Sequence, residues 1–135
     1  MTTPVRILIV DDEESFSKST AHILEEEGYV CHCAANTNEG LAALALEEFD
    51  LVLSDIRMPG NDTNLAFFRQ VHDQYPDIPL IAITGYPSLD TAIRCIRFKV
   101  SDYLVKPFEV DALKECVKTC LAERCATVPR GGGRQ

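Results

Sequence analysis

The sequence predicts an α/β fold: a single doubly wound, five-stranded parallel sheet in the order 2-1-3-4-5, with five flanking helices. The first observation is that five short runs of β-branched and aliphatic residues alternate strictly with five segments of helical apolar period. Such alternation is typical of βαβ units, which place helices on both faces of a parallel sheet. The second observation is that acidic, hydroxyl or basic residues directly follow four of the runs. Because ligands of open parallel sheets bind at that edge, the sequence also predicts a functional site there.

The expected strands lie at residues 5–10, 29–34, 51–55, 80–84 and 103–105. The first, third and fourth are continuous hydrophobic runs, as expected of central strands that are buried on both faces. The second contains Cys31-His32-Cys33, which favours a position at the edge of the sheet. Right-handed crossovers between parallel strands then favour the order 2-1-3-4-5.

The first expected helix covers residues 15–27 and stops at Gly28, because glycine commonly follows a helix C-terminus. The second covers 38–48, the third follows Asn64 and ends before Pro76, the fourth covers 89–98 and the fifth begins near 110. Apolar residues of helical period predict each helix. They are Phe16, Thr20, Ile23 and Leu24; Leu41, Leu44 and Ala45; Leu65, Phe68 and Val71; Leu89, Ala92, Ile93 and Ile96; and Val110, Leu113, Val117, Cys120 and Leu121.

The length of 135 residues fits one domain with an adequate core, which we place at residues 4–122. Residues 123–135 end in a Gly- and Arg-rich stretch and are expected to form a flexible C-terminal tail or truncated linker. No apolar run approaches the roughly 20 residues of a membrane-spanning helix, and the first residues lack a secretory pattern. We therefore expect a cytoplasmic protein with no membrane partner.

The formal net charge is −8, with 21 acidic and 13 basic residues. Affinity for a nucleic-acid backbone comes mainly from lysine and arginine, which displace counterions. This balance argues against direct nucleic-acid binding by the domain. A partner protein with a basic face remains compatible with it.

The six cysteines raise the alternatives of a metal site or a disulfide. Cys116 and Cys120 are four residues apart in an expected helix, but the paired CxxC spacing of most zinc sites is absent. Free cysteines in a reducing compartment behave as small apolar residues. The spacing therefore favours a core role over a metal or redox role.

Asp11, Asp12, Asp55, Thr84 and Lys106 follow strands whose carboxyl ends should converge. Capping of the following helix is an alternative role for the first two acids. However, two carboxylates about 4 Å apart repel by roughly 4 kcal/mol at an effective dielectric constant of 20. A divalent cation or an ammonium group removes this penalty, and Mg²⁺ suits because it prefers oxygen ligands and retains water and phosphate.

These residue types suit phosphoryl transfer. Asp55 can act as a nucleophile that forms an aspartyl phosphate. The incoming phosphoryl charge must be neutralised by Mg²⁺ on one side and by a cation such as Lys106 on the other. Thr84 supplies a short hydroxyl that can reach a phosphoryl oxygen.

Together the motifs resemble the receiver domain of two-component response regulators over about residues 4–121. The matching segments are Asp11-Asp12, Asp55 with Met58-Pro59-Gly60, Thr84-Gly85, and the run Asp102-Tyr103-Leu104-Val105-Lys106-Pro107-Phe108. The resemblance implies a flavodoxin-like fold and a phosphoacceptor that takes its phosphoryl group from a sensor histidine kinase or a phosphotransfer protein. It also implies a switch of the face formed by the fourth helix, fifth strand and fifth helix, which controls a downstream output.

The resemblance further implies a role for each residue at the site. Asp55 is the phosphoacceptor, and Mg²⁺ is bound by Asp11, Asp12, Asp55 and the backbone carbonyl of Arg57. Lys106 binds the phosphoryl group, and Thr84 and Tyr103 form the switch pair. The peptide bond before Pro107 is often cis in this family.

The sequence departs from the family pattern at two places. Residues 58–64 lack the second glycine of the usual loop and number one more than expected, and Lys99 stands where the family usually has glycine. On the expected output face, three basic residues from 94 to 99 lie near acids at 102, 111 and 115. This pattern favours a solvated mixed-charge surface, with a salt-sensitive homodimer through the same face as the alternative.

Three other functions are weighed against this one. A Mg²⁺-dependent phosphatase of the haloacid dehalogenase type also forms an aspartyl phosphate, but its Asp-x-Asp motif is replaced here by Asp11-Asp12-Glu13 and no cap domain is present. A flavodoxin-like cofactor carrier needs a hydroxyl- and glycine-rich loop where this chain has four acids. A degenerate receiver would lack part of the residue set, which is complete.

Overall fold

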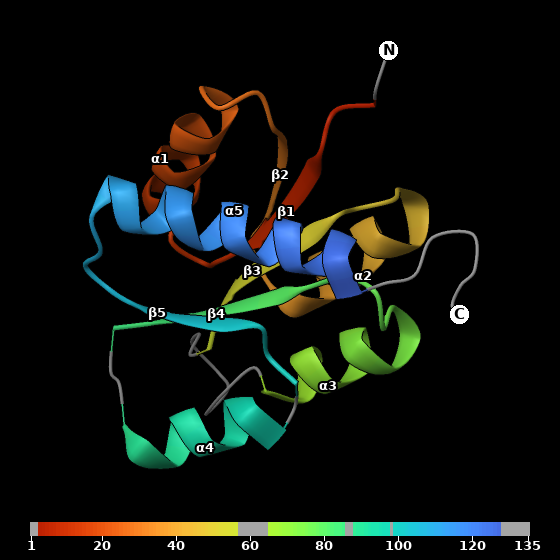
Figure 1. Ribbon diagram of the computed structural model, residues 1–135, viewed down its shortest axis with the longest axis vertical. Coiled ribbons are helices and arrows are strands. Elements are labelled where there is room, and N and C mark those ends of the chain that lie inside the picture. The colour runs from red at the N-terminus through yellow and green to blue at the C-terminus, as the bar shows by residue number, and fades with distance from the viewer. Residues whose placement is uncertain (1–2, 57–64, 86–87, 98, 128–135) are drawn as a thin grey trace.

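Five parallel strands form the central layer of the structure (Figure 1). The computed structural model describes residues 3–56, 65–85, 88–97 and 99–127. The strand order is β2-β1-β3-β4-β5, which confirms the predicted topology. The strands are β1 (Arg6–Val10), β2 (Val30–Ala34), β3 (Leu51–Asp55), β4 (Leu80–Thr84) and β5 (Asp102–Val105).

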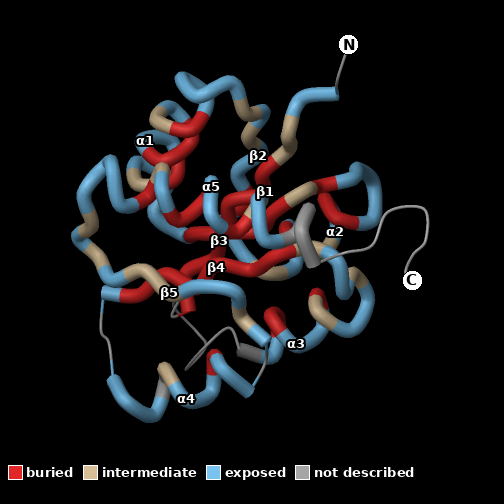
Figure 2. Tube along the Cα trace, in the orientation of Figure 1, coloured by how far each residue is buried: buried red, intermediate tan, exposed pale blue. Residues whose placement is uncertain are grey.

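The helices cover both faces of this sheet. They are α1 (Glu14–Glu25), α2 (Thr37–Leu46), α3 (Leu65–Gln74), α4 (Leu89–Arg97) and α5 (Val110–Thr127). Helices α1 and α5 pack on one face and α2, α3 and α4 on the other, and each face has its own apolar cluster. Figure 2 shows the buried residues gathered along the sheet between these layers. Strands β3 and β4 are buried throughout, whereas β2 is a largely exposed edge strand, as predicted.

Helix α1 ends at a left-handed glycine. Gly28 has a φ of 95°, and its N–H donates to the carbonyl of Glu25 while the N–H of Tyr29 donates to that of Leu24. This pair of hydrogen bonds forms a Schellman motif, which satisfies carbonyls left open at a helix end. The stop predicted at Gly28 is therefore confirmed.

Helix α4 is followed by the same motif with lysine in the glycine position. Lys99 has a φ of 62°, its N–H donates to the carbonyl of Ile96, and the N–H of Val100 donates to that of Cys95. A side chain in the left-handed region costs roughly 1–2 kcal/mol, which explains why glycine is usual here. The departure at Lys99 therefore leaves the backbone turn intact and adds strain to it.

The apolar stripe of α4 is largely exposed. Leu89 is 77% exposed, Ile93 is 42% exposed and Ile96 is 75% exposed, whereas Cys95 is 3% exposed and joins the core. Apolar periodicity identifies one side of a helix but not what covers that side. Here the stripe faces solvent, and the helix is anchored through Cys95.

The inward face of α2 includes small residues that its apolar pattern does not mark. Ala45 is exposed, whereas Gly40 and Ala43 are buried with Leu44. A Cβ atom at Gly40 would lie 3.1 Å from the side chain of Val10 and 3.3 Å from that of Phe67. The absence of a side chain at residue 40 therefore lets this helix approach β1 closely.

Helix α5 continues to Thr127, five residues beyond position 122, where the sequence analysis places the end of the domain. The remainder of the expected tail, residues 128–135, lies outside the described residues. Within the described part of the chain, no helix combines the length and apolar character needed to cross a membrane.

Candidate functional site

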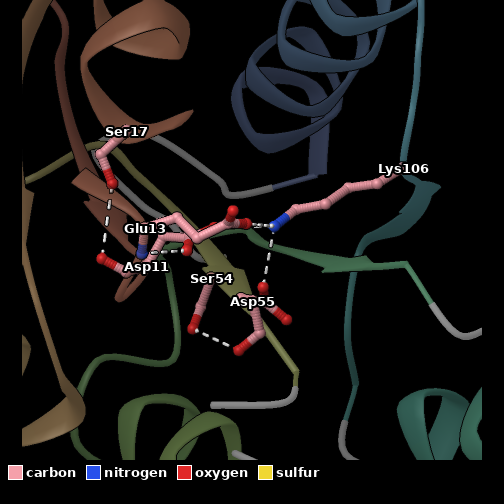
Figure 3. Close-up of polar contacts among 6 residues, drawn as sticks. All are labelled: Asp11, Glu13, Ser17, Ser54, Asp55 and Lys106. Atoms are coloured by element: carbon pink, nitrogen blue, oxygen red, sulfur yellow. Dashed lines mark hydrogen bonds and ion pairs between the residues drawn. The ribbon is translucent and has the colours of Figure 1, made fainter. Parts of the chain in front are cut away.

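The strand register brings the predicted polar residues to one edge of the sheet. Val10 pairs with Ser54, Asp55 with Ile83, and Thr84 with Val105. Asp11 and Lys106 are the next residues after β1 and β5, so they lie at the same carboxyl edge. Four segments far apart in the sequence therefore meet there, as Figure 3 shows for its labelled side chains.

Lys106 is the centre of the observed polar network. Its ammonium nitrogen lies 2.9 Å from Oδ2 of Asp55, 3.1 Å from Oδ2 of Asp11 and 3.3 Å from Oε1 of Glu13. It also lies 4.0 Å from the centroid of the Phe16 ring, close enough for a cation–π contact. The lysine side chain is 17% exposed, so these interactions are only partly screened by water.

The predicted acidic residues form a compact cluster. One carboxylate oxygen from each of Asp11, Asp12 and Asp55 lies within 4.8 Å of the other two. Asp11 and Asp55 are buried, while Asp12 is exposed and gives the cluster access to solvent. These three hard oxygen donors are of the kind that Mg²⁺ prefers, so the residues present fit that ion.

The surroundings of Asp11 fix the orientation of its carboxylate. Its Oδ1 accepts a hydrogen bond from the backbone N–H of Glu13 at 2.8 Å, and its carbonyl oxygen accepts one from the hydroxyl of Ser17 at 3.4 Å. Glu13 itself is the N-cap of α1, and its side chain makes no capping hydrogen bond. Asp11 therefore binds the backbone at the start of α1 through one carboxylate oxygen and Lys106 through the other.

The surroundings of Asp11 and Lys106 change the pKa values of both groups. Burial raises the pKa of Asp11, while the Glu13 N–H and Lys106 oppose this shift. Burial disfavours the charged form of Lys106, but hydrogen bonds to Asp55 and Asp11 outweigh it and raise the pKa of the lysine. Lys106 is therefore a permanent cation at physiological pH, facing acids whose charges it does not fully balance.

Thr84 and Tyr103 lie on the same face of the sheet. Tyr103 pairs with Ala82, and alternation along β4 puts Thr84 on the side of Ala82, away from Ile83. Thr84 is fully buried, and the Tyr103 ring packs against the core cluster that contains Cys95. This arrangement links the hydroxyl at the site to an aromatic residue beneath α4.

The hydroxyl of Tyr103 is buried and makes no standard hydrogen bond within the described residues. Burial raises the pKa of Tyr103, and the backbone of Ser88 opposes this shift. The ring of Tyr103 packs against the apolar cluster on this face of the sheet.

Two further expectations concern the backbone. The Lys106–Pro107 peptide bond is cis. Arg57, whose carbonyl the sequence analysis assigns to the metal, lies outside the described residues.

Sequence reasoning missed two residues that contact Lys106. Glu13 supplies a third carboxylate, and the run of four acids from residue 11 to residue 14 was a signal that could have indicated it. Phe16 lies beneath the ammonium group, and no motif marks that position. Both residues come from the start of α1, which borders the site.

The comparisons with known proteins agree with this geometry. The protein-family model described as the response regulator receiver domain matches residues 7–118 of this chain. The transcriptional regulator NtrC of Salmonella typhimurium strain LT2 is 37% identical over 116 residues, which is 86% of this chain and 24% of that protein. DctD of Rhizobium meliloti strain 1021, a C4-dicarboxylate transport regulatory protein, is 32% identical over 92% of this chain and 27% of its own length. The chain thus spans about a quarter of these relatives.

Solved structures show the same likeness. A CheY-like receiver domain protein from Methanospirillum hungatei JF-1 has a TM-score of 0.87 at 35% identity, covering 92% of this chain and 98% of that one. The beryllofluoride-activated NtrC4 receiver domain dimer has a TM-score of 0.83 at 34% identity, covering 88% and 98%. These matches support a receiver rather than a phosphatase of the haloacid dehalogenase type. The chain belongs to the response regulator receiver domain family of two-component signalling.

Proposed function

We propose that Asp55 accepts a phosphoryl group from a sensor histidine kinase or a phosphotransfer protein, in a reaction that requires Mg²⁺. The observation that carries this proposal is the position of Lys106, whose ammonium nitrogen lies 2.9 Å from Oδ2 of Asp55 beside two further acids. A nucleophilic carboxylate with a fixed cation beside it is what an aspartyl-phosphate reaction needs.

In the transfer step, a carboxylate oxygen of Asp55 forms a bond to phosphorus. The nitrogen–phosphorus bond of the donor phosphohistidine breaks, and its electron pair stays on the imidazole. The ammonium group of Lys106 stabilises the negative charge of the phosphoryl oxygens. Hydrolysis of the same acyl phosphate ends the signal, so the chain catalyses only its own phosphorylation and dephosphorylation.

Asp11, Asp12 and Asp55, with the carbonyl of Arg57, would hold Mg²⁺. A bound Mg²⁺ would supply positive charge to the phosphoryl oxygens in addition to that of Lys106. Asp12 is the exposed member of the acidic cluster, so it is the ligand that an arriving ion meets first. Asp11 and Asp55 are already oriented by their hydrogen bonds to Lys106.

We assign Thr84 and Tyr103 to the switch that reports phosphorylation. The Thr84 hydroxyl moves toward the phosphoryl group, and Tyr103 moves inward into the space that Thr84 vacates. A nearly complete switch needs roughly 5 kcal/mol of difference in phosphoryl contacts between the two states. Charge-assisted hydrogen bonds from Lys106 and the Thr84 hydroxyl supply part of it.

The changed surface of α4, β5 and α5 would control a downstream output, and it offers a homodimer interface. Leu89, Ile93 and Ile96 form an exposed apolar stripe there, and Val105 of β5 is 40% exposed. The named dimer of the NtrC4 receiver supports association of this kind. We place the receiver at residues 4–122 of a cytoplasmic protein that does not bind nucleic acid through this domain.

The proposal is tested by treating the protein with phosphoramidate or acetyl phosphate in the presence of Mg²⁺ and measuring its intact mass. One phosphoryl adduct is expected, which EDTA prevents and which Asp55→Asn lacks. Asp77→Asn removes an exposed acid before β4, at the opposite edge of the sheet, and should react as the wild type does. A wild type without an adduct, or an adduct that persists in Asp55→Asn, contradicts the assignment.

A further inference from the structure

The first residue of β5 and the middle of α5 bring together a second group of potential metal ligands, separate from the phosphoryl site. Sγ of Cys116, Sγ of Cys120 and a carboxylate oxygen of Asp102 all lie within 4.8 Å of one another. The i, i+4 spacing puts both thiols on one face of α5, where Cys116 is 7% exposed and Cys120 is 2% exposed. The sequence spacing did not indicate a site because the third ligand comes from a different element.

Asp102 is positioned toward the thiols by its own backbone contacts. Its Oδ1 accepts a hydrogen bond from the N–H of Tyr103 at 2.7 Å, which leaves Oδ2 to lie 3.1 Å from Sγ of Cys116. Such a hydrogen bond to the second oxygen orients a ligating carboxylate. Asp102 is exposed, so an ion can reach the buried sulfur atoms from solvent through it.

The Cys116 thiol donates a hydrogen bond to Oδ2 of Asp102, so the three groups already converge. A divalent cation would displace the thiol protons, because thiolate is the form of cysteine that binds metals. Two thiolates and one carboxylate would leave the bound site with a charge of −1.

We propose that Asp102, Cys116 and Cys120 form a binding site for a thiophilic divalent cation, with Zn²⁺ as the expected ion. Two sulfur ligands favour Zn²⁺ over Mg²⁺, which the all-oxygen cluster at Asp11, Asp12 and Asp55 suits instead. Three protein ligands leave the fourth tetrahedral position to water. Because Asp102 directly precedes Tyr103, a bound ion would tie α5 to the strand that carries the switch residue.

Co²⁺ is the spectroscopic probe for this site, because thiolate ligation gives an intense near-ultraviolet charge-transfer band. The reduced, EDTA-treated and desalted full chain should show this band at one equivalent of Co²⁺, and Zn²⁺ should abolish it by displacement. Cys116→Ser and Asp102→Asn should each weaken Zn²⁺ binding at least tenfold in competition with a chromogenic chelator. Circular dichroism reports whether each variant is folded, and the exposed Asp102 is the safer position to change.

Two control variants separate this site from the rest of the chain. Cys95→Ser removes a buried thiol that is absent from the ligand group, and Asp55→Asn alters the acidic cluster, so both should retain the cobalt band. Absence of the band in the wild type overturns the proposal, as does full Zn²⁺ affinity in folded Cys116→Ser or Asp102→Asn. None of these outcomes depends on whether Asp55 is phosphorylated.

Discussion

The ammonium group of Lys106 reaches Asp55 across the intervening strand β4, and Nζ lies 2.9 Å from Oδ2. The same nitrogen contacts Asp11 and Glu13, and a carboxylate oxygen of Asp12 lies within 4.8 Å of those of Asp11 and Asp55. The site thus has a net negative charge and is partly buried. Without a second cation, repulsion among the carboxylates destabilises the folded chain, and the same repulsion favours binding of a cation.

Mg²⁺ should therefore stabilise the folded chain. At ten times its dissociation constant, a ligand specific to the folded state adds about 1.4 kcal/mol, or a rise of roughly 4–6 °C in Tm for a domain of this size. Asp12→Asn should remove most of the rise while leaving the fold intact, because Asp12 is exposed. Differential scanning calorimetry with Mg²⁺ and with EDTA measures this effect. Asp77→Asn serves as the control. If Mg²⁺ raises the Tm of Asp12→Asn as much as that of Asp77→Asn, the acidic cluster is excluded as the binding site.

Replacing Lys106 should affect both stability and chemistry. Lys106→Ala leaves Asp11 and Asp55 without their cation, and we expect a loss of about 1–3 kcal/mol in EDTA, less than for a fully buried pair. Phosphorylation of Asp55 should also slow. Lys106→Arg keeps the charge and should recover most of the stability. Urea unfolding and intact-mass kinetics measure the two effects, and an alanine variant as stable as the wild type in EDTA contradicts the first.

The sequence predicted the elements whose signals are local and continuous. Strand β4 was predicted at its observed bounds because it is buried on both sides and reads as one apolar run. At α4, by contrast, an apolar stripe equally regular in sequence lies in solvent. Periodicity reports which residues share a face, whereas burial depends on whether another element covers that face.

At the site, too, the residues at strand ends were predicted, whereas contacts that depend on packing between elements were not. Asp11, Asp55 and Lys106 were predicted to converge because parallel strands end at one edge. The contact between Phe16 and Lys106 depends on how α1 sits against the chain after β5, which no spacing in the sequence reveals. The three-ligand group at Asp102 was missed for the same reason, since it joins two elements.

Lys99 and Gly28 provide a matched test of backbone strain. Both follow a helix at positive φ in the same hydrogen-bonded motif, so they differ mainly in the side chain. Lys99→Gly should stabilise the chain by about 0.5–1 kcal/mol, because relief of left-handed strain exceeds the entropy cost of glycine.

Gly28→Ala should destabilise the chain by about 1 kcal/mol through its backbone alone, since no atom lies within 4 Å of the added Cβ. Urea unfolding measures both changes. Shifts of the same sign in the two variants would show that the left-handed backbone does not determine these stabilities.

Cys31 should be an unreactive thiol at neutral pH. Burial raises its pKa to about 12, with smaller contributions from Glu25 and Cys33. At pH 8 the thiolate is then on the order of 10³-fold scarcer than in an unfolded chain. Because the pKa of Cys31 is higher in the folded chain than in the unfolded chain, the thiol contributes fully to the free energy of unfolding below its unfolded pKa. This contribution declines as the pH rises from that value toward 12. Iodoacetamide labelling followed by peptide mass spectrometry should show slow modification when folded and fast modification in urea; equal rates would contradict the shift.

The exposed stripe on α4 makes the dimer proposal testable without disturbing the fold. Ile96 is 75% exposed, so Ile96→Ser should change the free energy of unfolding by no more than about 0.5 kcal/mol. If α4 forms the interface, the variant should weaken any dimer that sedimentation velocity detects after beryllofluoride treatment. Leu46 is 83% exposed on α2 and supplies the control, because Leu46→Ser removes similar apolar area on another helix. Monomer alone in the treated wild type rules out this dimer, and equal weakening by both variants points to nonspecific apolar association, because only α4 belongs to the proposed output face.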